Sequence, residues 1–366
     1  MGILSKKMLM KVMAGNTLPQ MLMRDEFTTP LTAGAIDGTA AEPGVGIRKA
    51  NDTSNYISIE NGKLRFSGAK QVTGDPCFWL DGMSRVNGRT CLVKASKTNQ
   101  SGVGPLVGFS NSNTGYITNG DGIYWNNTNL TMLTGVYSNL IGNVTQQVIL
   151  CVILRSLSSL LFVELNGAWI YLGTWGSDVT PTKYPLFVTH YNTEVFADYI
   201  RIADLPAPFN DDYGLVTQRL AGARTAGETF THEANALVYW TVTTRADGQQ
   251  VAIRKQDDSN YWRVDVAADG SIALQEVVAG TPTSRGTGAA GSIANGQRMV
   301  VIADGTTIRV YANNVLKITY ASATNFQAAT AGKLLALGTG GAISDIITWP
   351  RYLSGAAADI LDRYSK

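Results

Sequence analysis

Apolar and polar residues alternate in short runs along most of this 366-residue chain, which is the pattern of half-buried β-strands. The clearest example is residues 161–172, where two alternating runs flank Asn166-Gly167, a strong signal for a β-hairpin. A two-residue turn there predicts an apolar face built from the opposed pairs Leu165–Ala168, Val163–Ile170 and Leu161–Leu172. The other face then carries Phe162, Glu164, Trp169 and Tyr171.

A related hairpin is predicted at residues 308–320, with a three-residue turn that ends at Asn314. Its opposed apolar pairs would be Val310–Leu316 and Ile308–Ile318. Asn166 and Asn313 are 147 positions apart, and three other segments recur in the same order at nearly this offset. These pairs are 107–116 with 252–261, 147–154 with 297–304, and 196–202 with 343–349. We interpret the recurrence as two copies of one domain.

Further short strand-like runs, separated by Gly, Asn and Asp, predict an all-β fold. In the first copy they lie at 56–60, 63–66, 77–80, 90–94, 106–110, 122–125, 147–154, 186–190 and 196–202. Only the Ala-rich residues 353–361 predict a helix within the copies, with Ser354 as its N-cap. We therefore predict two tandem antiparallel β-sandwich domains with a short C-terminal helix.

The predicted division of the chain has three parts, with Pro206 and Pro208 marking the linker between the copies. Residues 1–24 form an N-terminal arm, 25–205 the first sandwich, and 206–366 the second sandwich with its helix. The first copy also contains an extra hairpin at residues 56–66, around a second Asn-Gly turn. Its polar side (Glu60, Lys63, Arg65) either contacts a partner or only accompanies a widened sheet.

The strand order, the Asn-Gly hairpin, the late strand with a central Asp and the ending Pro350-Arg351-Tyr352-Leu353-Ser354 together resemble concanavalin A-like, laminin-G-like jelly-roll domains. The resemblance covers about residues 25–355 and implies two packed antiparallel sheets per copy. Such domains occur as lectins, glycosidases, adhesion modules and phage tail or head proteins. A double copy behind a short arm is most similar to a phage virion protein.

This resemblance implies a non-enzymatic structural role in the virion, through contacts with other virion proteins and with copies of itself. The alternative is a lectin-like adhesion module that binds carbohydrate, such as a host-surface glycan. Composition agrees with an assembly component, because charged residues make up only 16% of the chain. The arm is the expected docking element, with Met8, Met10, Met13, Met21 and Met23 as adaptable contact residues.

Charge and hydropathy exclude two classes of partner. The net charge of +2 comes from the basic arm, so the body is slightly acidic and does not resemble a nucleic-acid binder. No apolar run approaches the length of a membrane helix, so we expect no membrane insertion and no secretion signal.

Cys77, Cys91 and Cys151 are expected to be buried apolar residues, with a Cys77–Cys91 disulfide as the alternative.

Catalytic chemistry is not indicated by any motif, and we expect no enzyme activity, metal or cofactor. His190 and His232 lie at non-equivalent positions, and Glu164 has no carboxylate neighbour on its strand face, unlike a glycosidase pair. The oxygen-rich loops 119–122 and 257–260 could hold calcium, but turn formation also explains them.

Aromatic residues are the candidates for carbohydrate binding, because flat rings stack on sugar rings. In the first copy these are Trp125, Trp169, Tyr171 and Trp175. Their alternative position is in the core or in a subunit interface, where aromatic residues also pack well.

Overall fold

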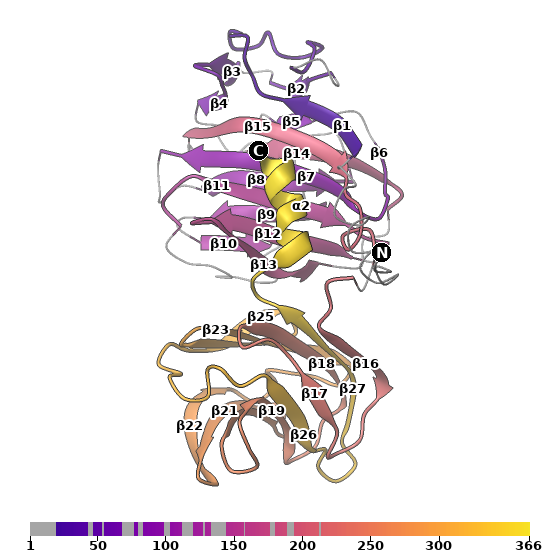
Figure 1. The fold of residues 1–366 in the computed structure, drawn as a ribbon, viewed down its shortest axis with the longest axis vertical. Helices are drawn as coiled ribbons and strands as arrows, with labels where there is room; N and C mark the ends of the chain where they lie inside the picture. The colour runs from indigo at the N-terminus through magenta and orange to yellow at the C-terminus, as the bar shows by residue number, and fades with distance from the viewer. Residues whose placement is uncertain are drawn as a thin grey trace, which may run out of the picture. The chain divides into compact units, whose positions relative to one another are not determined.

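The structure is a computed structural model, and it describes residues 20–42, 47–52, 55–67, 77–79, 83–98, 103–111, 120–126, 129–132, 144–156, 158–175, 180–188, 194–211 and 214–366. The chain divides into two compact units. Unit 1 comprises Met1–Gly214 together with Leu353–Lys366, and unit 2 comprises Leu215–Tyr352. Each unit is an antiparallel β-sandwich, so the predicted all-β fold is confirmed (Figure 1).

Unit 1 contains two sheets. Sheet 1 has the order β13-β12-β11-β7-β15-β4-β3, and β1 also pairs with β15. Its strands are β1 (Gln20–Asp25), β3 (Ile57–Glu60), β4 (Lys63–Ser67), β7 (Arg89–Lys97), β11 (Val148–Leu154), β12 (Ser159–Leu165), β13 (Ala168–Trp175) and β15 (Glu194–Asp204). Sheet 2 has the order β10-β9-β8-β14-β5-β2, with β6 paired to β14. Its strands are β2 (Lys49–Asn51), β5 (Cys77–Trp79), β6 (Met83–Ser84), β8 (Val103–Ser110), β9 (Gly120–Asn126), β10 (Asn129–Met132) and β14 (Thr182–Val188).

Unit 2 also contains two sheets, each of six strands. Sheet 3 consists, in order, of β16 (Gln218–Ala223), β27 (Ala342–Pro350), β18 (Ala236–Thr244), β23 (Gln297–Asp304), β24 (Thr307–Ala312) and β25 (Val315–Tyr320). Sheet 4 consists, in order, of β17 (Thr229–Thr231), β26 (Ala331–Ala336), β19 (Gln249–Lys255), β20 (Tyr261–Val266), β21 (Ile272–Val278) and β22 (Thr281–Gly288). Alternate residues of both sheets point inward and form one apolar core around Trp240 and Trp262.

The strand orders of the two units correspond. Sheet 1 without β3 and β4 reads β13-β12-β11-β7-β15-β1, and sheet 3 reads β25-β24-β23-β18-β27-β16. The central Asp residues of the predicted repeat, Asp198 and Asp345, occupy equivalent places on β15 and β27. Each lies at an irregularity in strand pairing. The repeat read from the sequence therefore coincides with a shared order of strands.

The two repeated hairpins form, and in each of them part of the register differs from the prediction. In the first, Val163 faces Ile170 as predicted, although a bulge places Leu161 opposite Gly173 instead of Leu172. In the second, Ala312 faces Val315, so the turn has two residues and the predicted pairs are wrong: Val310 faces Ile318. Asn313 and Asn314 both have positive φ, +45° and +66°, which is the conformation a two-residue turn of this kind requires.

The C-terminal helix α2 (Gly355–Ser365) belongs to unit 1, not to the second sandwich as predicted. Its buried residues Ala357, Ile360, Leu361 and Tyr364 recur at helical spacing and form one apolar stripe. Ser354 is the N-cap, but its side chain makes no capping hydrogen bond. Unit 2 is therefore an insertion between the strands of unit 1 and its closing helix.

The predicted boundary after residue 24 also differs from the structure, because it cuts through β1. Asp25, at the end of β1, is fully buried and forms a two-bond ion pair with Arg48, with N–O distances of 2.6 and 2.8 Å. Asp25 also accepts hydrogen bonds from the backbone N–H groups of Phe27 and Glu42. The sandwich of unit 1 thus begins at β1.

The extra hairpin forms β3 and β4 as predicted, and β4 pairs with β15. Ile57, Ile59, Leu64 and Phe66 are buried. On the polar side Arg65 pairs with Glu60 and Glu194, and Lys63 pairs with Asp198. The hairpin therefore widens sheet 1, and a partner contact on its polar side stays a prediction.

Candidate binding face

The aromatic residues predicted to bind sugar lie inside unit 1 wherever their side chains are described. Trp125 is 0% exposed, and the Lys97 ammonium lies 4.9 Å from its ring centroid. Trp169 and Tyr171 are each 2% exposed, on the face of sheet 1 that α2 covers, and Trp169 Nε1 donates to Asp362 at 2.8 Å. These rings have no open face in this chain, which fits the core alternative. The backbone of Trp175 ends β13, and its side chain lies outside the described residues.

The predicted docking residues divide between described and undescribed parts of the chain. Met8, Met10 and Met13 lie outside the described residues. Met21 and Met23 belong to β1, and Met23 is buried. Met23 therefore packs within unit 1, and the docking role of the other methionines stays a prediction.

The remaining candidates from the sequence have structural partners. Asp121, in the first oxygen-rich loop, is buried and pairs with Lys183 at 2.9 Å and Arg85 at 3.1 Å. Asp257, in the second, accepts hydrogen bonds from Ser259 and Asn260 within its own turn. The described residues contain no cluster of three or more side chains able to hold a metal ion.

The described histidine is a buried structural residue. His232 Nε2 accepts a hydrogen bond from the backbone N–H of Arg254 at 3.1 Å, and Nδ1 donates to the Glu233 carbonyl at 2.7 Å. Burial lowers the pKa of His232, which agrees with a neutral ring. His190 lies outside the described residues.

Cysteine chemistry is limited by burial. Cys91 and Cys151 are free thiols, which excludes the Cys77–Cys91 disulfide alternative. Burial raises the pKa of Cys91 to about 12 and that of Cys151 well above its usual value.

Within the described part of the chain, no helix is long and apolar enough to span a membrane.

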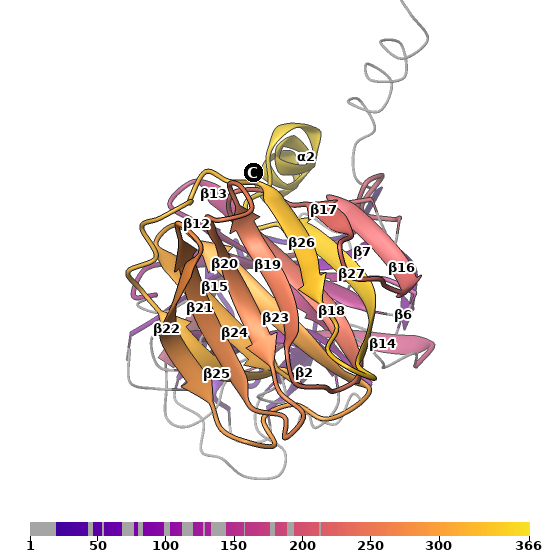
Figure 2. The ribbon, with the colours of Figure 1, turned by 90° about the horizontal axis from the view of Figure 1, so that it is seen from below.

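The outer face of sheet 4 in unit 2 carries several polar residues on neighbouring strands. Figure 2 shows the strands of this sheet. On β20, Trp262, Val264 and Val266 point into the core, so alternation directs Arg263 and Asp265 outward. Cross-strand pairing puts Gln250 of β19 opposite Asp265, and Gln275 of β21 opposite Arg263. We call Gln250, Arg263, Asp265 and Gln275 the polar block.

Small neighbours surround the polar block. Ala252 lies opposite Arg263, and Ala273 lies opposite Asp265, so alanine and long polar residues alternate across the three strands. Lys333 of β26 is opposite Ala252 and adds a cation at the edge of the block. The block residues are half-buried, which limits their rotamers while keeping part of each side chain at the surface.

The charged pair at the centre of the block is close but imperfectly bonded. Arg263 Nε lies 2.9 Å from Asp265 Oδ1, yet the contact lacks hydrogen-bond geometry. A second Arg263 nitrogen, Nη1, donates to Gln250 at 3.5 Å. Burial raises the pKa of Asp265, and the Arg263 guanidinium opposes this shift. The sequence analysis missed these residues, although the alternation in YWRVDV was a sufficient signal that Arg263 and Asp265 face outward.

Comparisons with known proteins identify no family for this chain. No family model matches the chain, and no curated protein matches it either. A galectin from Caenorhabditis elegans, LEC-6, matches 36% of this chain and 94% of its own length, at 9% identity and a TM-score of 0.30. The carbohydrate-binding module CBM66 from Bacillus subtilis matches 37% of this chain and 93% of its own length, at 11% identity and a TM-score of 0.27.

An enzyme of the same broad architecture is also similar. SCLam, an endo-β-1,3(4)-glucanase of family GH16, matches 50% of this chain and 91% of its own length, at 11% identity and a TM-score of 0.31. At these identities and TM-scores, the three matches assign no function to this chain. Binding modules and enzymes both occur among these proteins, so the comparisons do not separate the two classes of function.

Proposed function

We propose that this protein is a non-enzymatic, lectin-like glycan-binding protein and that the polar block of unit 2 contacts the sugar. The observation that supports this is the block itself, in which four hydrogen-bonding side chains occupy facing positions on three adjacent strands. Cross-strand neighbours have Cβ atoms about 5 Å apart, a spacing on the scale of one sugar ring.

The chemistry of the block suits hydroxyl groups. Each sugar hydroxyl donates and accepts a hydrogen bond, and the Gln250 and Gln275 amides can do both. The Asp265 carboxylate accepts and the Arg263 guanidinium donates, so vicinal hydroxyls can be recognised in a fixed orientation. Because these side chains extend from strands, the sheet holds them in place before a ligand arrives.

The block does not provide the groups for glycoside hydrolysis. Hydrolysis needs two carboxyl groups about 5–9.5 Å apart, one on each side of the bond. The block contains a single carboxyl group, Asp265. Binding without hydrolysis is therefore the activity we propose for this face.

A glycan array probed with the full chain tests the proposal. We expect hits that Arg263→Ala and Asp265→Ala reduce at least 10-fold, since hydrogen bonds to charged groups contribute about 1.5–3 kcal/mol. Thr319→Ala, an exposed change on sheet 3, is the control and should leave binding unchanged. An array without hits, or hits that neither block variant weakens, would contradict the proposal.

A structural role in a phage virion, with other virion proteins and copies of this chain as partners, stays a prediction from the family resemblance. We propose residues 1–19 as its docking element, the part of the predicted 1–24 arm that precedes β1. Deleting residues 1–19 should prevent incorporation into particles and leave both sandwiches folded. Normal incorporation of the shortened chain would contradict this role.

A further inference from the structure

A continuous row of side chains crosses the outer face of sheet 1. Direct cross-strand pairing places Arg201, Leu92, Cys151, Phe162 and Tyr171 side by side on β15, β7, β11, β12 and β13. All five are at most 3% exposed. Four of them are apolar or aromatic, so the row would be a large apolar surface if nothing covered it.

Helix α2 covers this row from one end to the other. At its start the Leu353 N–H donates to the Trp169 carbonyl on β13, and at its end the Tyr199 hydroxyl on β15 donates to the Ser365 carbonyl. Four strand spacings separate β13 from β15, about 19 Å, and an 11-residue helix is about 16 Å long. The helix length therefore matches the width of the row.

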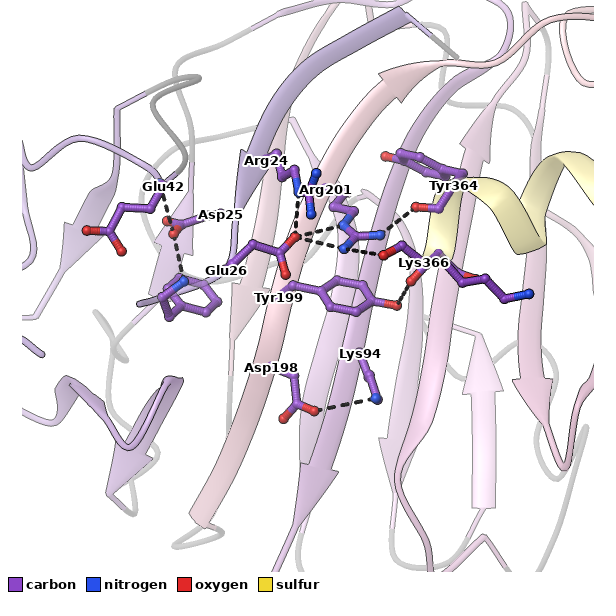
Figure 3. Close-up of polar contacts among 12 residues, drawn as sticks. Arg24, Asp25, Glu26, Glu42, Lys94, Asp198, Tyr199, Arg201, Tyr364 and Lys366 are labelled. Carbon is purple, nitrogen blue, oxygen red and sulfur yellow. Dashed lines mark hydrogen bonds and ion pairs between the residues drawn. The ribbon is translucent and has the colours of Figure 1, made fainter. Parts of the chain in front are cut away.

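The C-terminal end of α2 is held by a charged contact (Figure 3). Arg201 donates to the Tyr364 carbonyl at 2.8 Å and to the Lys366 carbonyl at 3.3 Å, where the helix dipole is negative. Glu26 pairs with the same guanidinium at 2.8 Å and fixes its orientation. These contacts define the register of the helix on the sheet.

The helix has few interactions of its own to keep it folded when it leaves the sheet. It has 11 residues, no acidic residue in its first turn and no side-chain cap from Ser354. Isolated helices shorter than about 12–15 residues are marginal in water. Docking on sheet 1 is therefore the main source of its stability, and undocking and melting of the helix are one event.

We propose that the row on sheet 1 is a helix-binding surface, that residues 353–366 are its ligand, and that this segment detaches and rebinds while both sheets of unit 1 stay folded. This inference is independent of the proposed glycan site, which lies on unit 2. Two features support local opening: the segment contributes no strand to either sheet, and its contacts come from one apolar stripe and a few end hydrogen bonds.

Two buried thiols make the opening measurable in the full chain. Cys151 lies in the row, opposite Phe162 and Leu92, on the face of sheet 1 that α2 covers. Cys91 is opposite Val152 and Ile202, on the inner face of the same sheet. Detachment of the helix exposes Cys151 alone, whereas Cys91 becomes accessible only when the sandwich opens.

The experiment compares maleimide labelling of two full-length single-cysteine proteins. One carries Cys77→Ser and Cys91→Ser, and the other carries Cys77→Ser and Cys151→Ser. We expect Cys151 to be labelled faster than Cys91 under native conditions. Equal labelling rates for the two thiols would overturn the proposal, because they would mean that the helix leaves only when the sandwich unfolds.

Variants that weaken the contacts of α2 with sheet 1 should raise the labelling rate of Cys151 and leave that of Cys91 unchanged. Leu361→Ala should raise its labelling rate about 30-fold or more, as removal of a buried leucine side chain implies. Asp359→Ala, at an exposed position of the same helix, is the matched control and should change the rate less than about threefold. Tyr199→Phe removes only the hydrogen bond to Ser365 and is the milder variant, with about a fivefold increase expected.

A synthetic peptide of residues 353–366 tests the binding surface itself. Added to the Leu361→Ala protein, it should slow Cys151 labelling in a saturable manner, while a peptide carrying Leu361→Ala should have less effect. Absence of protection by the unmodified peptide would overturn the assignment of this face as a helix-binding surface.

Discussion

The buried Asp25–Arg48 pair gives a sharp test of where unit 1 begins. Both side chains are at most 2% exposed, and two N–O contacts of 2.6 and 2.8 Å join them. Asp25→Asn keeps the shape of the side chain and removes its charge. The buried Arg48 guanidinium then keeps only its longer contact with Glu42, at 3.7 Å, and breaking a buried ion pair typically costs about 3–5 kcal/mol.

The cost is large relative to the stability of an ordinary domain, about 5–15 kcal/mol. For a sandwich of this size it corresponds to a fall of about 6–20 °C in the melting temperature. Differential scanning calorimetry of the full chain measures this fall. The transition of unit 2 serves as an internal reference, because Asp25 and Arg48 both belong to unit 1.

Two further variants separate the charge effect from general damage. Arg24→Ala breaks the nearby ion pair between Arg24 and Glu26. The Arg24 side chain is 42% exposed, so this change should lower the free energy of unfolding by less than about 1 kcal/mol. Arg48→Met in the Asp25→Asn background should recover part of the loss, since it removes a buried charge that has lost its main partner. If Asp25→Asn costs less than about 1 kcal/mol, the pair does not anchor β1 and our placement of the start of unit 1 is wrong.

Four other predictions follow from the structure. Burial lowers the pKa of Lys97 to about 8, so between pH 8 and 10.5 the unfolded chain binds one more proton than the folded chain. Unit 1 should therefore become more stable as pH rises through this range. Lys97→Met should abolish this dependence of the unfolding free energy on pH, as measured by urea denaturation. Gly167→Ala should destabilise the first hairpin by about 1 kcal/mol because φ is +80° there, and Gly167→Asn by less, as measured by urea denaturation. Burial raises the pKa of Asp265, so this carboxylate is protonated at a higher pH than an ordinary aspartate and glycan binding should weaken from that pH downward. Asp265→Asn should remove the pH dependence of the binding affinity in calorimetric titrations. Residues 215–352 contain every strand of sheets 3 and 4, so this segment expressed alone should fold with its own cooperative transition in circular dichroism.

Local patterns in the sequence predicted much of the fold. Two Asn-Gly turns, the Asn313-Asn314 pair and alternating residues located three hairpins, and the spacing of Asp198 and Asp345 identified equivalent strands. The second turn was predicted with the wrong length because Asn tolerates positive φ at one turn position or at two. Such choices depend on how the flanking strands pair, which the turn residues alone do not determine.

Tertiary contacts account for what the sequence did not reveal. Trp169 and Tyr171 were correctly placed on the face opposite the aliphatic one, but their burial depends on a helix near the end of the chain. Trp169 and Asp362 are 193 residues apart, and no local pattern links them. The same alternation that located these rings also directs Arg263 and Asp265 outward, so the polar block was accessible to sequence analysis.

The insertion of unit 2 has a consequence for synthesis of the protein on the ribosome. The strands of sheet 1 leave the ribosome first, and the 138 residues of unit 2 must follow before α2 is made. At about 5–20 residues per second, the row from Arg201 to Tyr171 stays uncovered for about 7–28 s. Unit 1 is therefore the first unit to emerge and the last to be completed. During this interval the nascent chain presents an apolar surface of the kind that chaperones bind.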